Sequence, residues 1–181
     1  MSAVFASKEN EILEELNNRI YSSKPWTSSD TAHYLNEADK FFQTNPEIAY
    51  VIKGIVYTHD KDEYLMRKNF ELALEISENE TVICNYMTSL QKFDYLIDVI
   101  NLGLKYENIV NSKEIIRLIA KSYLQLGMFN NAKYYMSKIL SNDEINQIIK
   151  KEEPYIHLEA NEKMKESFRK DREIWKNLAN S

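Results

Sequence analysis

The sequence is poor in the residues that interrupt helices, with three glycines and three prolines among 181 residues. It also lacks segments of strict apolar–polar alternation flanked by the paired turn residues that a β-hairpin needs. Because glycine and proline are the strongest breakers of regular structure, their scarcity favours long helices. We therefore expect an all-α fold.

Other absences narrow the environment and the partners. One cysteine excludes an internal disulfide, and no run approaches the roughly 18 apolar residues of a membrane span. The start of the chain has neither the basic nor the apolar region of a signal peptide. The net charge of −5 disfavours nucleic acid, because phosphate binding needs clustered lysine and arginine. We expect a cytoplasmic protein that binds neither membranes nor nucleic acid.

Groups that carry catalysis or hold metals are scattered. His33, His59 and His157 form no HxxxH or HExxH pair on one helical face. The sequence has no glycine-rich phosphate loop, no GxSxG elbow and no cysteine cluster for zinc. Cys84 stands at an apolar position, where packing is favoured over a nucleophilic role. We expect a protein that is not an enzyme and needs no cofactor or metal.

Residues 113–144 contain two apolar helical faces of small and aromatic residues. The first face comprises Ile116, Ile119, Ala120 and Tyr123, and the second comprises Ala132, Met136 and Ile139. Gly127 lies between them and predicts a tight turn. The small side chains allow the two helices to approach closely. This pattern resembles the tetratricopeptide repeat, a helix–turn–helix unit of about 34 residues.

Further copies of the pattern precede this segment. Residues 47–79 carry Gly54 at the small position and Tyr57 at the aromatic position, with Phe70 and Ala73 in the second helix. Residues 81–112 are a degenerate copy, with Thr88 and Gln91 where a small residue and a tyrosine are expected. Residues 7–44 form N-terminal helices that resemble a worn copy through Tyr34, Ala38 and Phe41.

The resemblance implies a right-handed solenoid of three to four helical hairpins, forming a single domain over residues 1–181. Another solenoid of helical pairs is the alternative. The predicted helices cover residues 7–22, 29–44, 46–58, 61–77, 79–91, 93–106, 112–126, 129–140, 142–151 and 155–178. Predicted capping pairs are Asn45 with Pro46, Asp60 with Glu63, Asn111 with Glu114, and Ser141 with Glu144.

In tetratricopeptide proteins the first helix of each hairpin lines a groove that holds a partner. The corresponding positions here are Ile48, Val51, Ile55, Thr58, Val82, Asn85, Ser89, Lys92, Glu114, Arg117, Lys121 and Leu124. From this set the predicted partner-binding residues are Val51, Ile55, Asn85, Ser89, Lys92, Arg117 and Lys121. Arg117 and Lys121 lie one helical turn apart, a spacing suited to holding a carboxylate between them. Two alternatives stay open: Ile48 and Val51 are core residues, and Arg117 pairs within its helix with Glu114.

Repeat scaffolds of this kind hold partners and rarely do chemistry. The leading functional hypothesis is therefore an adaptor that binds a peptide or helix of another protein. Val51 and Ile55 stand where the clamp of heat-shock cochaperones needs lysine and asparagine, which disfavours that role. The layout resembles the small export chaperones of bacterial secretion systems. The alternative is accordingly a dedicated chaperone, or an antitoxin-like neutralising partner, of a single client.

The last segment, residues 154–181, carries an apolar stripe on an otherwise charged background. The stripe comprises Ala160, Met164, Phe168, Trp175 and Leu178. A capping helix that closes the end of the array is the favoured interpretation. In the alternative, Phe168, Arg172 and Trp175 dock a partner or a second copy in a homodimer, because such residues are enriched at interfaces.

We expect Phe168 and Trp175 to pack on the last hairpin near Tyr134, Tyr135 and Ile139. Removing residues 155–181 should then lower the melting temperature and promote aggregation, since each buried aromatic ring covers about 150–250 Å². Calorimetry and light scattering on the truncated protein measure both effects. A truncated chain that stays monomeric, soluble and equally stable would exclude the capping role.

Overall fold

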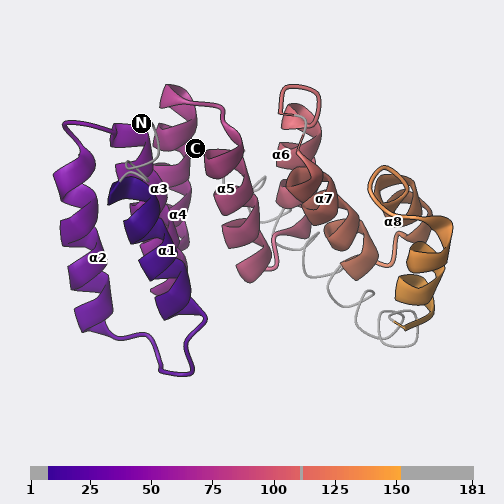
Figure 1. Cartoon of the computed structure of the whole chain (residues 1–181), viewed down its shortest axis with the longest axis horizontal. Coiled ribbons are helices and arrows are strands. Elements are labelled where there is room, and N and C mark those ends of the chain that lie inside the picture. The colour runs from indigo at the N-terminus through magenta and orange to yellow at the C-terminus, as the bar shows by residue number, and fades with distance from the viewer. Residues whose placement is uncertain (1–7, 111, 152–181) are drawn as a thin grey trace, which may run out of the picture. The chain divides into compact units, whose positions relative to one another are not determined.

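The computed structural model describes residues 8–110 and 112–151, and all regular structure in these ranges is α-helical (Figure 1). The helices are α1 Lys8–Ile20, α2 Ser28–Phe41, α3 Pro46–His59, α4 Glu63–Ile76, α5 Glu80–Lys92, α6 Leu96–Tyr106, α7 Lys113–Gln125 and α8 Phe129–Met136. A further helical segment covers residues 142–151. Within the described ranges, no helix is long and apolar enough to cross a membrane.

The predicted helices from 7–22 to 142–151 are confirmed, with shifts at their ends. The largest shift is in the predicted helix 129–140, which ends at Met136. The predicted helix 155–178 lies outside the described residues. The all-α fold class is therefore confirmed for the part of the chain that the structure covers.

The chain divides into two compact units, Met1–Ser89 and Leu90–Ser181, and the boundary falls within α5. In the first unit α2 packs against α3, and α3 against α4. In the second unit α6 packs against α7, and α7 against α8. In these four pairs, helices that are adjacent in sequence are also neighbours in space.

Three turns with the same backbone geometry follow α3, α5 and α7. Their φ angles are positive at Lys61 (61°), Asp94 (59°) and Gly127 (72°), so the spacing is 33 residues in both intervals, 61 to 94 and 94 to 127. The residue after each positive-φ residue donates its backbone N–H to the carbonyl five residues before it. In the third turn, the Met128 N–H donates to the Tyr123 carbonyl at 2.9 Å. These are left-handed helix ends of the Schellman type, in which glycine is the commonest residue. The predicted turn at Gly127 is confirmed.

The repeated turn corrects the register of the second hairpin. A step of 33 residues places Met87 and Leu90 at the positions of Gly54 and Tyr57, in place of the predicted Thr88 and Gln91. Both side chains are buried, Met87 fully and Leu90 with 2% of its surface exposed. α5 begins at Glu80, one residue before the predicted range 81–112.

Two of the predicted helix starts are confirmed and two are wrong. Asn45 caps α3 through a bond from the Ile48 N–H, and Ser141 exchanges bonds with Glu144. Those bonds, led by the one from the Ser141 hydroxyl, lower the pKa of Glu144. The predicted caps Asp60 and Asn111 are replaced by Asp62 at α4 and Ser112 at α7. The observed caps lie later in the chain because α4 begins at Glu63 and α7 at Lys113, after the predicted starts at residues 61 and 112.

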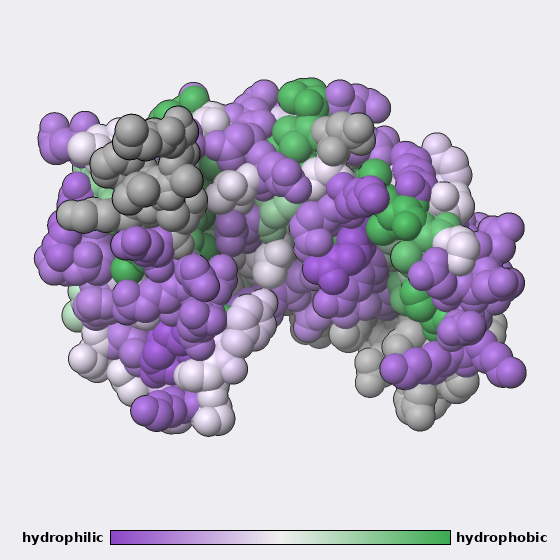
Figure 2. Space-filling view, viewed as in Figure 1, coloured by the Kyte–Doolittle hydropathy of each residue, from purple (hydrophilic) through white to green (hydrophobic). Residues whose placement is uncertain are grey.

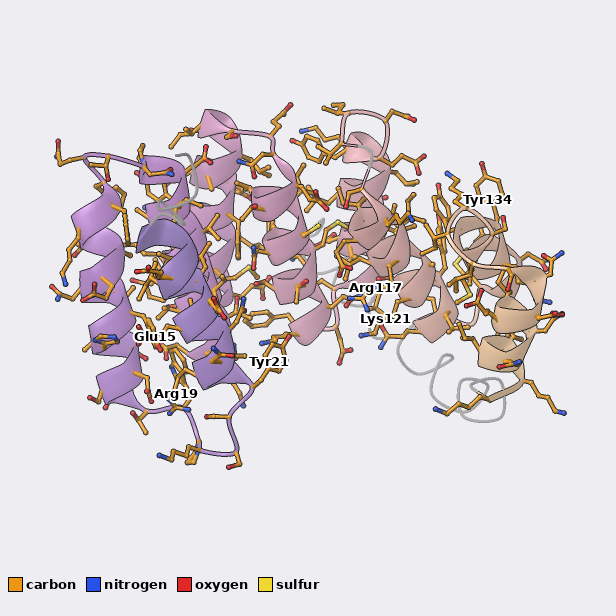
Figure 3. The ribbon with its side chains drawn as sticks, viewed as in Figure 1. Glu15, Arg19, Tyr21, Arg117, Lys121 and Tyr134 are labelled. Carbon is orange, nitrogen blue, oxygen red and sulfur yellow. The ribbon has the colours of Figure 1, made fainter. Side chains whose placement is uncertain are left out.

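Arg19 fastens the end of α1 to the start of α2 (Figure 3). Two of its guanidinium nitrogens donate to the Asp30 carboxylate at 2.6 Å. The same group donates to the backbone carbonyls of Lys24 and Pro25 in the connecting loop. The bonds from Arg19 to the ionised acid hold the pKa of Asp30 well below its usual range. The loop between the two helices is thus tied to α1 by one side chain.

The core of the first unit depends on the contact of α3 with α4. A Cβ atom placed on Gly54 would lie 2.6 Å from Cε2 of the Phe70 ring. Phe70 is fully buried and stacks on Tyr86 with ring centroids 5.0 Å apart, so it has little room to move. The absence of a side chain at Gly54 is therefore what lets these helices approach.

The first fold prediction concerns Ala132, which is fully buried in α8 as the sequence predicts. Replacing Ala132 by Leu should overpack the hairpin of α7 and α8 and lower the free energy of unfolding by about 1–3 kcal/mol. Replacing the adjacent Asn131 by Leu is the control, because that side chain is exposed. Urea melts followed by circular dichroism measure the difference. Equal stability of both variants would contradict the packing described here.

The second fold prediction concerns Gly54. In an exposed helix, a change of Gly to Ala stabilises by about 1 kcal/mol, whereas overpacking costs about 1–3 kcal/mol. With Phe70 in contact, we expect Gly54→Ala to destabilise the protein. The same change in a Phe70→Leu background should cost less, because the ring has been removed. A stabilising Gly54→Ala in the wild-type background would refute the close approach of α3 and α4.

Candidate functional site

An apolar pocket of about 230 Å³ lies between α7, the end of α8 and the helical segment 142–151. The described residues that line it are Arg117, Ala120, Lys121, Leu124, Met136, Ile139, Leu140 and Ile148. Figure 2 shows hydrophobic surface gathered around α7 and α8, next to hydrophilic surface of α7. All of these residues belong to the second unit. The pocket is thus a feature of one compact body.

The local sequence explains why this surface is hollow and apolar. Ala120 and Leu124 lie four residues apart, so they occupy one face of α7. Ala120 contributes only a methyl group, whereas Met136 comes from α8 and Ile148 from the next helix. The small side chain on α7 and the separation from residue 148 together leave space between the helices.

Two cations border this apolar space. Arg117 and Lys121 lie one turn apart on the same side of α7 (Figure 3). Both side chains are exposed, Arg117 to 68%. Positive charge beside an apolar hollow suits a ligand that combines an apolar group with a carboxylate.

Arg117 has a partner within its own helix. Its Nε and Nη2 atoms donate to the Glu114 carboxylate at 2.9 and 2.6 Å. The alternative in which Arg117 pairs with Glu114 is therefore confirmed. Lys121 makes no ion pair with another residue of the described ranges. The two cations at the pocket consequently differ in their availability to a ligand.

The first unit holds four of the predicted partner-binding residues, and three of these are buried. Val51 is fully buried, and Ile55 and Ser89 are 7% and 4% exposed. The alternative in which Ile48 and Val51 are core residues is thereby confirmed. We do not retain Val51, Ile55 or Ser89 in the candidate site, because buried residues offer little or no surface to a partner.

The remaining predicted residues do not reach the pocket. Asn85, in the first unit, donates from its side chain to the backbone carbonyl of Thr81 at 2.8 Å. Lys92, in the second unit, is partly exposed, and burial of the rest lowers its pKa. Of the predicted set, the structure brings together only Arg117 and Lys121. The alternative set, Phe168, Arg172 and Trp175, lies outside the described residues.

Sequence reasoning missed Leu140 and Ile148 as site residues. It treated Ala120, Met136 and Ile139 as packing positions only. A signal for Ile148 exists, since Ile145, Ile148 and Ile149 follow the three- and four-residue spacing of an apolar helical face. Ile145 and Ile149 are buried, whereas Ile148 is half-buried and opens onto the pocket.

Two larger hollows lie on the first unit, and both are lined by charged residues. One, of about 590 Å³, lies along α4 at Glu63, Tyr64, Arg67, Lys68 and Glu71. The other, of about 520 Å³, lies against α1 and α2 at Glu11, Ile12, Glu15, Glu37, Lys40, Phe41 and Thr44. Their charged walls are well solvated, so burying them would cost more than burying the apolar pocket. The pocket beside α7 is therefore the stronger candidate for a binding site.

Metal ligands do not gather in the part of the chain that the structure describes. No group of three histidine, cysteine, aspartate or glutamate side chains there is placed to hold an ion. Cys84 is half-buried in α5. Within these ranges the pocket beside α7 is the candidate site that the lining residues support best.

Comparisons with known proteins find no family model, no curated protein and no solved structure that matches the chain. The resemblance to tetratricopeptide repeats is accordingly carried by the residues of this chain alone.

Proposed function

We propose that the chain is a non-enzymatic protein-interaction module that binds a peptide or helix of a partner through the pocket beside α7. The observation that carries this proposal is an apolar hollow with two exposed cations, Arg117 and Lys121, on its border. Such a surface combines a place for an apolar side chain with a place for a carboxylate. We propose that the partner segment supplies both the apolar side chain and the carboxylate.

The size of the hollow favours a side chain over a free small molecule. Sites for drug-sized ligands typically measure about 300–1,000 Å³ and bury most of the ligand. A pocket of about 230 Å³ is smaller than this range and suits one or two side chains of a larger partner. Burying one such leucine or phenylalanine contributes roughly 1.5–3 kcal/mol.

The two cations contribute to the specificity and the association rate of binding more than to its affinity. An exposed ion pair typically contributes about 0–1 kcal/mol, so Lys121 alone does not hold a partner. Complementary charges nevertheless accelerate encounter and exclude partners of the wrong sign. We infer that the apolar contact supplies most of the affinity and that the cations select for acidic segments.

We also propose that the chain is built as a tetratricopeptide-like array. The supporting features are turns at steps of 33 residues and the contact of Gly54 with Phe70. In such arrays each hairpin stacks on the next and presents its first helix to a ligand. The place of the pocket beside α7, the first helix of its hairpin, agrees with this plan.

Substitutions at Ile148 and at the two cations test the pocket. Ile148→Glu should abolish retention of native partners, because it places a charge in the apolar hollow. Arg117→Ala combined with Lys121→Ala should weaken binding while leaving the fold intact, and reversal of both charges should weaken it further. Affinity capture from native lysate recovers the partner, and calorimetric titration of the recovered partner measures each change.

Lys133→Glu is the matched control, because Lys133 is an exposed lysine of α8 that does not line the pocket. All variants should show the same circular dichroism spectrum. A partner that binds Ile148→Glu and the double alanine variant as tightly as wild type would refute the assignment of the pocket. One stoichiometric partner would favour a client chaperone, and several partners would favour an adaptor.

A further inference from the structure

We propose that Glu114 lowers the affinity of the pocket for acidic partners by occupying Arg117 as an internal substitute for the partner's carboxylate. This inference rests on the proposed function and adds a residue that tunes it. In this account Lys121 contributes more than Arg117 to binding the partner's carboxylate, because Arg117 is already paired with Glu114.

The geometry of the pair supports the substitution. The Glu114 carboxylate accepts bonds from Nε and Nη2 of Arg117, the two-point arrangement in which a guanidinium also binds a ligand carboxylate. The same nitrogens cannot bind both carboxylates with this geometry at once. A partner that reaches Arg117 must therefore displace Glu114 or share the guanidinium with it.

The pair is also open to exchange. The Arg117 side chain is 68% exposed and the Glu114 side chain is 40% exposed. Water competes for both groups at such exposure, so the pair is weak and can open. Opening it makes the Nε and Nη2 donors that Glu114 occupies accessible to a partner carboxylate, but it leaves the Glu114 charge nearby.

Charge repulsion acts in the same direction. Glu114, Arg117 and Lys121 follow one another at intervals of three and four residues, so they share one face of α7. The carboxylate of Glu114 cancels part of the positive potential at this face. An approaching carboxylate thus meets less attraction than two cations alone would supply.

Lys121 differs from Arg117 in this respect. It lies two turns from Glu114 and forms no ion pair with the described residues. Its ammonium can meet a partner without breaking an existing pair. The predicted order of contributions to the binding of an acidic segment is therefore Lys121 first and Arg117 second.

The test uses Glu114→Gln, which keeps the shape of the side chain and removes its charge. The probe is a short helical peptide of leucine, alanine and glutamate with acetylated and amidated ends. The same peptide with glutamine in place of glutamate is the neutral probe. Chemical-shift titration by NMR measures dissociation constants even when binding is weak.

We expect Glu114→Gln to bind the glutamate peptide about two- to fivefold more tightly than wild type, in line with one exposed charge interaction. The neutral peptide should show no gain. In an Arg117→Ala background the gain should shrink, because the guanidinium that Glu114 restrains is absent. Lys121→Ala should weaken binding of the glutamate peptide more than Arg117→Ala does.

Glu75→Gln is the control for net charge, since Glu75 is an exposed residue of α4 in the first unit. If wild type binds the glutamate peptide and Glu114→Gln does not strengthen binding, the inference is wrong while the proposed pocket stands. If no variant binds either peptide, the proposed function and the inference both fail. An equal gain for both peptides would also overturn the inference, because it would show that charge is not the cause.

Discussion

The close approach of paired helices is the constraint on which the rest of the structure depends. In the first unit a glycine hydrogen at Gly54 faces the ring of Phe70, and a single Cβ would lie 2.6 Å from that ring. In the second unit Ala120 and the fully buried Ala132 supply the small side chains of α7 and α8. Interiors are packed as densely as crystals, so a gain of even one methyl group at such positions is felt.

The same constraint shapes the candidate site. Ala120 is nearly fully buried, yet it also lines the pocket, so one small residue serves both the packing of α7 and the hollow beside it. The pocket walls are then completed by Met136 and Ile148, from helices that follow α7 in the chain. The apolar hollow lies where α7, the end of α8 and the helical segment 142–151 meet, and Ala120 contributes only a methyl group to it.

The charged side chains of α7 beside the pocket are placed with little loss of solvation energy. Arg117 and Lys121 of α7 are exposed to solvent. Their charges therefore carry little desolvation cost in the folded protein. The pairing of Arg117 with Glu114 removes part of that positive charge locally. In the proposed function, the apolar part of this surface provides affinity and the charged part provides selection.

Much of the fold could be predicted from sequence because several helix ends are marked by capping and turn residues. Asn45 with Pro46 predicted the start of α3, and Gly127 predicted the turn after α7. The equivalent turns at Lys61 and Asp94 carried no such signal, since neither residue requires a positive φ. The predicted cap at Asp60 and the register of the second hairpin were wrong for this reason.

The site was predictable only in part, because sequence fixes the face of a residue but not what covers that face. Arg117 and Lys121 were identified from their spacing on α7, and both border the pocket. Val51 and Ile55 occupy corresponding positions on α3 but are buried in their own unit. The spacing of Ile145, Ile148 and Ile149 places Ile148 on an apolar helical face, but it does not show that this face borders α7.

Methyl NMR of the protein bound to its recovered partner tests the central claim most directly. If the pocket beside α7 takes an apolar side chain of the partner, the methyl signals of Met136, Ile139 and Ile148 should shift. They should also show intermolecular nuclear Overhauser effects to a partner side chain. Shifts confined to methyl groups of the first unit, with these three signals unchanged, would contradict the account.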